Sequence, residues 1–188
     1  MKYISIDTET TGLDPFTNSI TEIAIIVDDL SNPIPIDQLP TFVTYVGYPQ
    51  DLTWNVFAMN MFKDRIDEYA KADKTPHSDV VDKIINFLRP HFGDIIEGKV
   101  KITVGGKNFA SFDKKFLDAL PYGCLLMDAI HHRSIDVGSM YMEREDIVIP
   151  SLEECKKRAG ISGGIPHQAL DDAKDVVRLI RHKYGICI

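Results

Sequence analysis

Two carboxylates follow the first apolar stretch of the chain, at the point where a buried strand would end. Ile4 and Ile6 begin this stretch, and Asp7 and Glu9 follow within the segment IDTETTGLDP. Because side chains alternate along a strand, Asp7 and Glu9 are expected on the same face. Such a pair is unfavourable at a buried strand end unless a cation lies between the carboxylates. The pair therefore predicts a site for a hard divalent cation such as Mg²⁺ or Mn²⁺, with two solvated acids as the alternative.

Two adjacent aspartates near the C-terminus add to this chemistry. The segment HQALDDAKDVVRLI is typical of a helix, and a rotation of about 100° per residue places Ala169, Ala173 and Val176 on its buried stripe. The same rotation places Asp172 on the flank of that stripe and Asp171 toward solvent. An inward acid needs a partner, which a metal ion or a neighbouring lysine or arginine could provide.

Two further residues could take part in chemistry at a strand end or a helix start. Asp113, in GKNFASFDKKFL, follows one expected strand and begins an expected helix. Sites form at strand ends in α/β sheets, although a first-turn acid that complements the helix dipole is the alternative. His167 precedes Asp172 by five residues, near the expected start of the last helix. A helix N-terminus disfavours a protonated imidazole, so His167 is a candidate base, with a structural or solvated histidine as the alternative.

Three segments of the chain together resemble a known enzyme family. DTETTGLDP, NFASFD and HQALDD resemble, in order and across nearly the whole chain, the three exonuclease motifs of the DEDDh group of 3′–5′ exonucleases. This group is the DnaQ-like branch of the ribonuclease H-like fold, and it includes the proofreading subunit of bacterial DNA polymerase III, ribonuclease T and oligoribonuclease. The resemblance implies a phosphodiester hydrolase that uses two divalent cations, Mg²⁺ or Mn²⁺.

The same resemblance implies a role for each matching residue. Asp7, Glu9, Asp113 and Asp172 would form the metal-binding cluster, and His167 would be the general base. Asp7 would bridge the two cations, with Glu9 and Asp172 completing the first site and Asp113 holding the second, partly through water. A two-metal site of this kind provides both an attacking water and stabilisation of the phosphate charge.

The turn after the first strand is expected to contact the 3′ nucleotide. The backbone N–H groups of Thr10 and Thr11, in the tight turn that contains Gly12, could donate to a sugar or a phosphate. Leu13 could wedge against the terminal base. These four residues are therefore assigned to substrate binding.

The second motif adds two further substrate-binding candidates. Asn108 and Phe109 precede Asp113, and Phe109 could stack on a base, an interaction of about 1–3 kcal/mol that tolerates any sequence. Core packing is the alternative for each aromatic residue, and it is favoured for Phe112, which is expected to face into its helix beside Phe116. The sequence thus predicts Phe109 in the site and Phe112 in the core.

The favoured function is a 3′–5′ exonuclease that acts on single-stranded nucleic acid, with DNA favoured in a proofreading, repair or processing role. The alternatives are an exoribonuclease for short RNAs and an inactive nucleic-acid-binding module on the same fold. The expected partners are a single-stranded DNA or RNA 3′ end and a polymerase or other replication or repair protein, with no membrane.

The expected elements are a mixed sheet of about five strands flanked by helices, in a three-layer α/β domain of the ribonuclease H-like class. The first two strands are separated by a turn-rich link, so they should form an antiparallel hairpin. The expected strands cover 2–8, 20–29, 41–47, 101–105 and a short stretch near 135. The expected helices cover 78–91 with Ser78 as the cap, about 112–120, 151–160 and about 167–184, with short helices within 51–72.

Length and composition are those expected of one intracellular domain. The chain has 188 residues, which suits a single exonuclease domain over 1–188, and it has no apolar run long enough to span a membrane and no secretory signal. The three cysteines, Cys124, Cys155 and Cys187, are expected to be reduced, buried and not part of a zinc site. The net charge of -7 disfavours nucleic-acid binding unless bound cations reverse the local field. We therefore expect a cytoplasmic protein.

Overall fold

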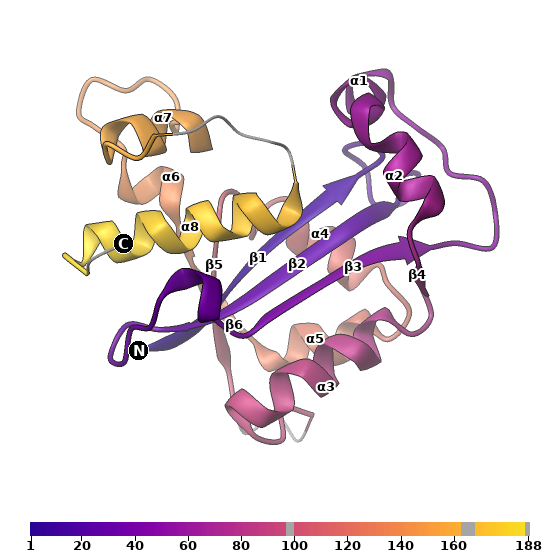
Figure 1. The fold of residues 1–188 in the computed structure, drawn as a ribbon, viewed down its shortest axis with the longest axis horizontal. Coiled ribbons are helices and arrows are strands. Elements are labelled where there is room, and N and C mark those ends of the chain that lie inside the picture. The colour runs from indigo at the N-terminus through magenta and orange to yellow at the C-terminus, as the bar shows by residue number, and fades with distance from the viewer. Residues whose placement is uncertain (97–99, 163–167, 187–188) are drawn as a thin grey trace.

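Strand β1 lies in the middle of a mixed sheet (Figure 1). The computed structural model describes residues 1–96, 100–162 and 168–186. Antiparallel pairing joins β1 to β2 and β2 to β3, whereas β5 runs parallel to β1 and β6 runs parallel to β5. The order across the sheet is β4-β3-β2-β1-β5-β6. The strands are β1 Lys2–Thr10, β2 Ile20–Asp29, β3 Thr41–Gly47, β4 Lys74–Pro76, β5 Ile102–Gly106 and β6 Ile130–Asp136.

Helices cover both faces of this sheet. The α-helices are α1 Val56–Phe62, α2 Ile66–Lys71, α3 Val80–Phe92, α4 Asp113–Asp118, α5 Gly123–Ala129, α6 Val137–Met140, α7 Leu152–Arg158 and α8 Ala169–Lys183. Two 3-10 helices, η1 Ile36–Gln38 and η2 Lys63–Arg65, complete the set in the described part of the chain. We call the segment of α1, η2 and α2, residues 56–71, the arm.

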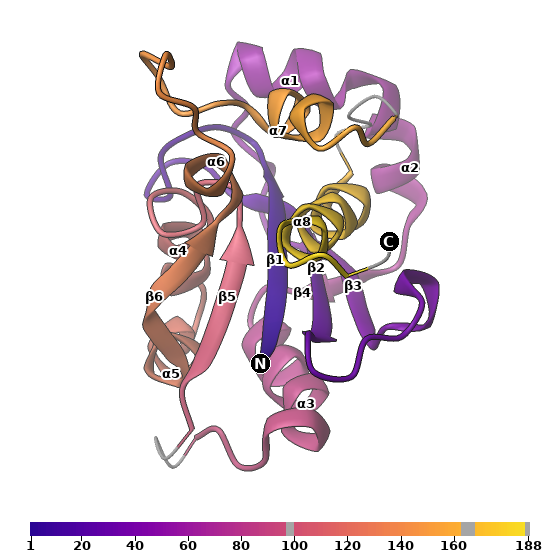
Figure 2. The same cartoon turned by 90° about the vertical axis from the view of Figure 1, so that its left-hand side faces the viewer.

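Alternation along β1 separates two cores. Ile4 and Ile6 pack into the larger core with buried residues of α3, α4 and α5. Tyr3, on the other face, packs with α6, α7 and α8. Figure 1 shows α8 crossing the sheet, and Figure 2 shows α4 and α5 on the other side of β1 from α8. The predicted mixed sheet between helical layers is confirmed.

The sheet differs from the prediction at its two edges. It has six strands rather than about five, because the three-residue β4 pairs with β3 at one edge. At the other edge β6 is seven residues long rather than a short stretch near 135. Edge strands pair on one side only and have weaker apolar patterns, which is why the sequence pattern did not reveal their extent. The predicted hairpin of β1 and β2 is confirmed.

Helix starts also differ in detail. Helix α3 begins at Val80, and its N-cap Asp79 makes no side-chain capping bond. The predicted cap Ser78 instead donates its hydroxyl to Asp79 Oδ1 at 2.7 Å. Helix α7 is capped by Ser151, whose Oγ accepts from the Glu154 N–H at 3.2 Å. Helices α5 and α6 were not predicted at all.

The cysteine prediction needs one correction. Cys155 is buried and Cys124 is exposed, and both are free thiols. Cys124 lies on the outer side of the short helix α5, which the sequence analysis did not predict, and this explains the error for that residue. Cys187 lies outside the described residues. Within the described part of the chain, no helix combines the length and apolar character needed to cross a bilayer.

Candidate active site

The carboxylates of Asp7, Glu9 and Asp172 meet where α8 begins above β1. Each offers one oxygen, and these three oxygens lie within 4.8 Å of one another. Asp7 and Glu9 occupy alternate positions of β1, and Asp172 lies in the first turn of α8. On the same face of β1, the Ser5 hydroxyl donates to the carbonyl oxygen of Ala173 at 2.9 Å and holds the helix against the strand. We call Asp7, Glu9 and Asp172 the acidic triad.

Burial and repulsion disfavour the charged forms of the acidic triad. Burial, with the charges of Asp113 and Asp172, raises the pKa of Asp7 well above its usual range. Burial and the charge of Asp172 raise the pKa of Glu9 to about 8, and burial chiefly raises the pKa of Asp172 to about 7. Among the described residues, Asp172 Oδ1 is buried without a hydrogen-bond partner. An orphaned carboxylate oxygen beside two further carboxylates fits a hard divalent cation.

Asp113 lies next to the acidic triad but is held by a different contact. The Thr8 N–H and hydroxyl donate to Asp113 Oδ1 at 3.0 and 2.7 Å, because Thr8 points away from the face that carries Asp7. Burial raises the pKa of Asp113 to about 6, and the hydrogen bonds from Thr8 oppose that rise. The structure therefore brings three of the four predicted acids within a few ångströms and fixes the fourth through Thr8.

The remaining catalytic prediction concerns the start of α8. His167 lies outside the described residues. Asp172 is buried, with 8% of its surface exposed, whereas its neighbour Asp171 is half-buried. The inward direction predicted for Asp172 agrees with this burial, and Asp171 is less exposed than predicted.

A cavity of about 210 Å³ opens beside Glu9. Three segments that are distant in the sequence form its walls, and they come from the end of β1, the arm and the start of α4. Leu13 lines the cavity with 72% of its surface exposed, and Thr10 and Gly12 lie next to it. The other lining residues are Thr8, Asn55, Phe57, Ala58, Met61, Phe62 and Phe112. The cavity is apolar on the arm side and polar on the β1 side.

Thr11 does not fit its predicted role. It is fully buried, and its N–H donates to the Ser19 carbonyl oxygen at 2.8 Å, so this N–H is already used within the loop. Its hydroxyl accepts from the Ser19 N–H at 3.0 Å. Gly12 is required for the packing of the same loop, because a Cβ there would lie 2.3 Å from Asn18 Oδ1. Thr11 therefore shapes the turn, and its N–H is not free to donate to a sugar or a phosphate.

The prediction that Phe109 lies in the site is wrong, because Phe109 has 2% of its surface exposed and belongs to the larger core. The prediction for Phe112 holds in part. Phe112 is half-buried and packs against the same core, with its ring centroid 5.2 Å from that of Phe116, but it also lines the cavity. The cause is the turn after β5, where Asn108 has a φ of 62° in the left-handed region. Gly106 lets Phe109 pack closely beneath this turn, since a Cβ at Gly106 would lie 2.8 Å from the Phe109 Cβ.

Asn108 supports the loop and does not line the cavity in the described structure. Its N–H donates to Asp136 Oδ2 at 2.7 Å, and its Oδ1 accepts from Lys107 Nζ at 2.7 Å. Asp136 also caps α6, because its Oδ1 accepts from the Ser139 N–H at 2.9 Å. Asn108 thus links the loop before Asp113 to the end of β6.

Two buried ion pairs close to the acidic triad were not predicted from the sequence. Glu22 lies opposite Glu9 in the β1–β2 register, and Arg65 Nη2 donates to Glu22 Oε2 at 2.7 Å. On the other side, Lys156 of α7 pairs with Asp175 of α8. The hairpin register could have revealed Glu22, because aligning the outer ends of the two predicted strands, Lys2 and Asp29, places Glu22 opposite Glu9. No pattern in the sequence indicated Arg65 or Lys156.

The family comparison matches nearly the whole chain. The sequence pattern of the family described as RNase_T: Exonuclease matches residues 4–180. No curated protein sequence matches the chain significantly.

Solved structures share its fold. Exonuclease I of E. coli in complex with a dT13 oligonucleotide superposes with a TM-score of 0.66 and 18% identity, over 96% of this chain and 40% of that one. Exonuclease I of Methylocaldum szegediense superposes with a TM-score of 0.65 and 19% identity, over 98% of this chain and 41% of that one. Cell-death related nuclease 4 (CRN-4) superposes with a TM-score of 0.68 and 14% identity, over 98% of this chain and 64% of that one. The predicted fold is therefore confirmed, and the chain spans about 40% of the length of the exonuclease I chains.

Proposed function

The chain belongs to the RNase_T exonuclease family, as its motifs predicted, and from this premise we propose a metal-dependent 3′–5′ exonuclease that acts on single-stranded nucleic acid. One observation carries the proposal: three carboxylates from β1 and α8 meet within 4.8 Å, in a buried place where their charges repel. A binding module has no need of such an unfavourable cluster.

The donor set suits Mg²⁺ or Mn²⁺, because every candidate ligand is a carboxylate oxygen. Asp7, Glu9 and Asp172 would hold one cation, and Asp7 with Asp113 would hold a second. When bound, two such cations supply an activated water and neutralise charge on the phosphate. The Thr8 hydrogen bonds keep Asp113 Oδ1 oriented, so that the other oxygen of this carboxylate is the candidate ligand.

His167 is proposed as the general base from its motif position alone. A base near the attacking water contributes typically about 10²–10⁴-fold in rate and no ligand bond. His167→Ala is therefore expected to lower the single-turnover rate by that factor with unchanged Mn²⁺ affinity. A variant that mainly lost Mn²⁺ affinity in calorimetry would identify His167 as a ligand instead.

We propose that the cavity beside Glu9 receives the 3′ nucleotide. Leu13 and Phe112 offer apolar surface to its base, and Thr10 lies on the polar side where the sugar would lie. Because Glu9 borders the cavity, a phosphodiester attached to that nucleotide would lie next to the acidic triad. This arrangement supports removal of nucleotides one at a time from an end.

DNA is the favoured substrate. The support is that the E. coli exonuclease I structures with the same fold hold dT13 and dA16 oligonucleotides. The single-domain organisation over 1–188, the polymerase or repair partner and the cytoplasmic location stay predictions.

The test uses single-stranded DNA and RNA of equal sequence, each labelled at the 5′ end, with Mg²⁺ or Mn²⁺. We expect a ladder of shortening products that forms faster on DNA and disappears with a chelator. A faster ladder on RNA would assign an exoribonuclease of short RNAs. Binding without any cleavage would assign the inactive binding module.

A further inference from the structure

A further carboxylate, that of Glu22, lies directly beside the acidic triad and is used by none of the proposed steps. Glu9 of β1, Glu22 of β2 and Tyr45 of β3 are opposite one another in the strand register. Residues paired in this way point to the same face of a sheet, which here is the face covered by α8. Glu22 has 4% of its surface exposed. A buried acid next to three others needs a specific reason to be there.

The contacts of Glu22 join the sheet to the start of α8. Glu22 Oε2 accepts from the N–H of Ala169 at 3.4 Å. Ala169 is the first residue of α8, and its N–H belongs to the turn that has no intrahelical acceptor. Asp172 follows in the same turn and its N–H bonds to the Gln168 carbonyl oxygen at 3.0 Å. Glu22 thus fixes the helix turn that carries Asp172 beside the strand that carries Glu9.

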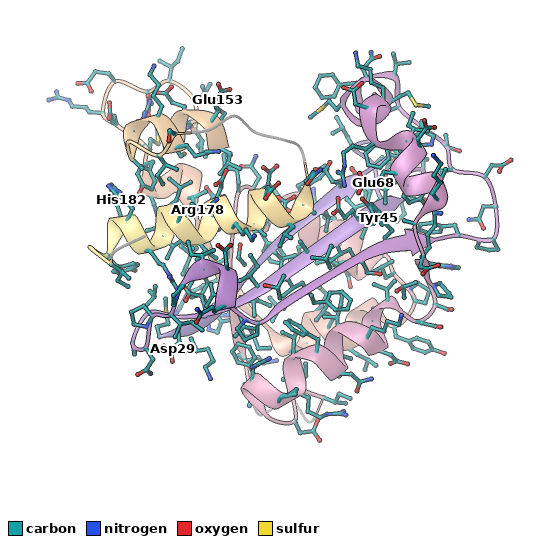
Figure 3. All side chains as sticks on the ribbon, viewed as in Figure 1. Asp29, Tyr45, Glu68, Glu153, Arg178 and His182 are labelled. Atoms are coloured by element: carbon teal, nitrogen blue, oxygen red, sulfur yellow. The ribbon has the colours of Figure 1, made fainter. Side chains whose placement is uncertain are left out.

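Arg65 joins the arm to the same carboxylate. Its Nη2 donates to Glu22 Oε2 at 2.7 Å and to the Tyr45 hydroxyl at 3.0 Å. Its guanidinium lies 5.3 Å from the ring centroid of Phe62, a cavity-lining residue. The Tyr45 hydroxyl also donates to Glu68 Oε1 at 2.6 Å, and Figure 3 shows Tyr45 and Glu68 together where the arm meets β3. The wall of the nucleotide cavity is therefore tied to the acid that supports the triad.

We propose that Glu22 and Arg65 are a pair of positioning residues for the reaction described above, an inference that rests on the proposed function. Glu22 sets the distance between Asp172 and the two acids of β1. Arg65 balances the charge of Glu22 and places the cavity wall relative to the same three carboxylates. A misplacement of about 1 Å in such a site can cost about 10²-fold in rate. A small shift of α8 relative to β1 after loss of this pair should therefore lower the rate measurably.

The competing explanation is that the pair only stabilises the fold. A buried ion pair can often be replaced by apolar residues of similar volume without loss of stability. The double variant Arg65→Met/Glu22→Leu therefore removes both charges and the polar contacts of both side chains while keeping the interior filled. If the pair only stabilises the fold, this double variant should keep both its stability and its activity. If the pair positions the acids, the variant should stay folded and lose activity.

Another buried ion pair, away from the triad, offers a matched control. Arg181 Nη2 lies 2.6 Å from Asp28 Oδ1, with both side chains buried, and this pair also joins α8 to β2. It lies six residues along β2 from Glu22, which is about 20 Å at the rise of a strand. Arg181→Met/Asp28→Leu makes the same kind of change far from the triad.

The experiment measures three quantities for both double variants and for wild type: the urea midpoint of unfolding, Mn²⁺ affinity by calorimetry, and the single-turnover rate on 5′-labelled dT12. For Arg65→Met/Glu22→Leu we expect a folded protein with Mn²⁺ affinity and rate each lowered by about 10–100-fold, as for other groups that orient metal ligands. The Arg181→Met/Asp28→Leu control should keep its Mn²⁺ affinity and its single-turnover rate within about twofold of wild type. A folded Arg65/Glu22 variant with the affinity and rate of the control would overturn the proposal.

A single variant decides the matter if the double variant does not fold. Arg65→Lys keeps a charge beside Glu22 and loses the planar guanidinium, whose Nε lies 3.7 Å from Glu68 Oε2 and whose face lies near the Phe62 ring. We expect its affinity for fluorescein-labelled dT12, measured by anisotropy with Ca²⁺, to fall about tenfold while Mn²⁺ affinity stays within twofold. Unchanged dT12 affinity would overturn the role of Arg65. Because Mn²⁺ calorimetry needs no cleavage, a wild-type protein that degrades neither dT12 nor an RNA of equal length refutes the proposed function and still leaves the role of Glu22 measurable.

Discussion

The two ends of the contact between α8 and the sheet treat buried acids in opposite ways. At one end, Asp28 accepts from Arg181 Nη2 and Nε at 2.6 and 3.0 Å and from the Tyr3 hydroxyl at 2.9 Å. At the other end, Asp172 keeps one buried oxygen without a partner in the described structure, beside Asp7 and Glu9. Helix α8 contributes to both sites, and the strand acids come from the paired strands β2 and β1. One end is saturated and holds the fold together, and the other is left unsatisfied and available to a cation.

The largest expected effect separates two adjacent aspartates. Asp172→Asn should lower the single-turnover rate by several orders of magnitude, because an amide cannot supply the anionic oxygen that a divalent cation needs. Asp171→Asn makes the same change one residue away, on a half-buried side chain outside the triad, and should stay near wild type. Rates at saturating Mn²⁺ check the pair. Equal losses would show that the triad is misassigned.

Alanine variants at the two ends should change stability in opposite directions. Asp28→Ala leaves Arg181 buried without its carboxylate and should cost about 3–5 kcal/mol of unfolding free energy. Asp7→Ala removes one of several repelling acids, so metal-free stability should be unchanged or higher while cleavage is abolished. Urea unfolding in a chelator measures both. A large stability loss in Asp7→Ala would mean that this acid is already satisfied within the fold.

The pH dependence of stability should come from the unsatisfied end. Burial raises the pKa of Glu9 from 4.5 to about 8, so the folded state holds protons that the unfolded state has released in that range. Metal-free stability should therefore fall as pH rises from about 4.5 to about 8. Mn²⁺ at 100 times its dissociation constant should add about 2.7 kcal/mol at pH 8, and much less at pH 5, where protons compete. Thermal unfolding at both pH values checks this, and an equal Mn²⁺ effect would contradict it.

The smallest expected effect compares Phe112, which lines the cavity, with Phe109, which lies in the core. Phe112→Ala should weaken dT12 binding by about 1–3 kcal/mol, the range for loss of one stacking contact, and should cost less stability than Phe109→Ala because Phe112 is only half-buried. Phe109→Ala should instead cost about 3–5 kcal/mol of stability, because it empties a core position. Anisotropy titrations and urea unfolding distinguish the two. Weaker dT12 binding in a folded Phe109→Ala variant alone would restore the prediction made from sequence.

Local patterns were enough for the parts of the site that lie within one element. Asp7 and Glu9 share a face because side chains alternate along any strand. Asp172 points inward because the rotation per residue is the same in any α-helix. The hairpin and the bounds of β2 and β3 followed from apolar runs between turn residues. The family resemblance was readable for the same reason, since its motifs are short and each lies in one segment.

Only the tertiary structure decided which segments meet. A left-handed Asn108 sends Phe109 into the core and leaves Phe112 at the cavity, and Arg65 reaches Glu22 because the arm folds back over β3. Thr8 takes one oxygen of Asp113 because α4 begins beneath β1. These contacts depend on how elements pack across distances of many residues, and no periodicity within a segment encodes them. The sequence by itself therefore determined which acids could hold a cation, and the packing of β1, β2, α8 and the arm determined how they are supported.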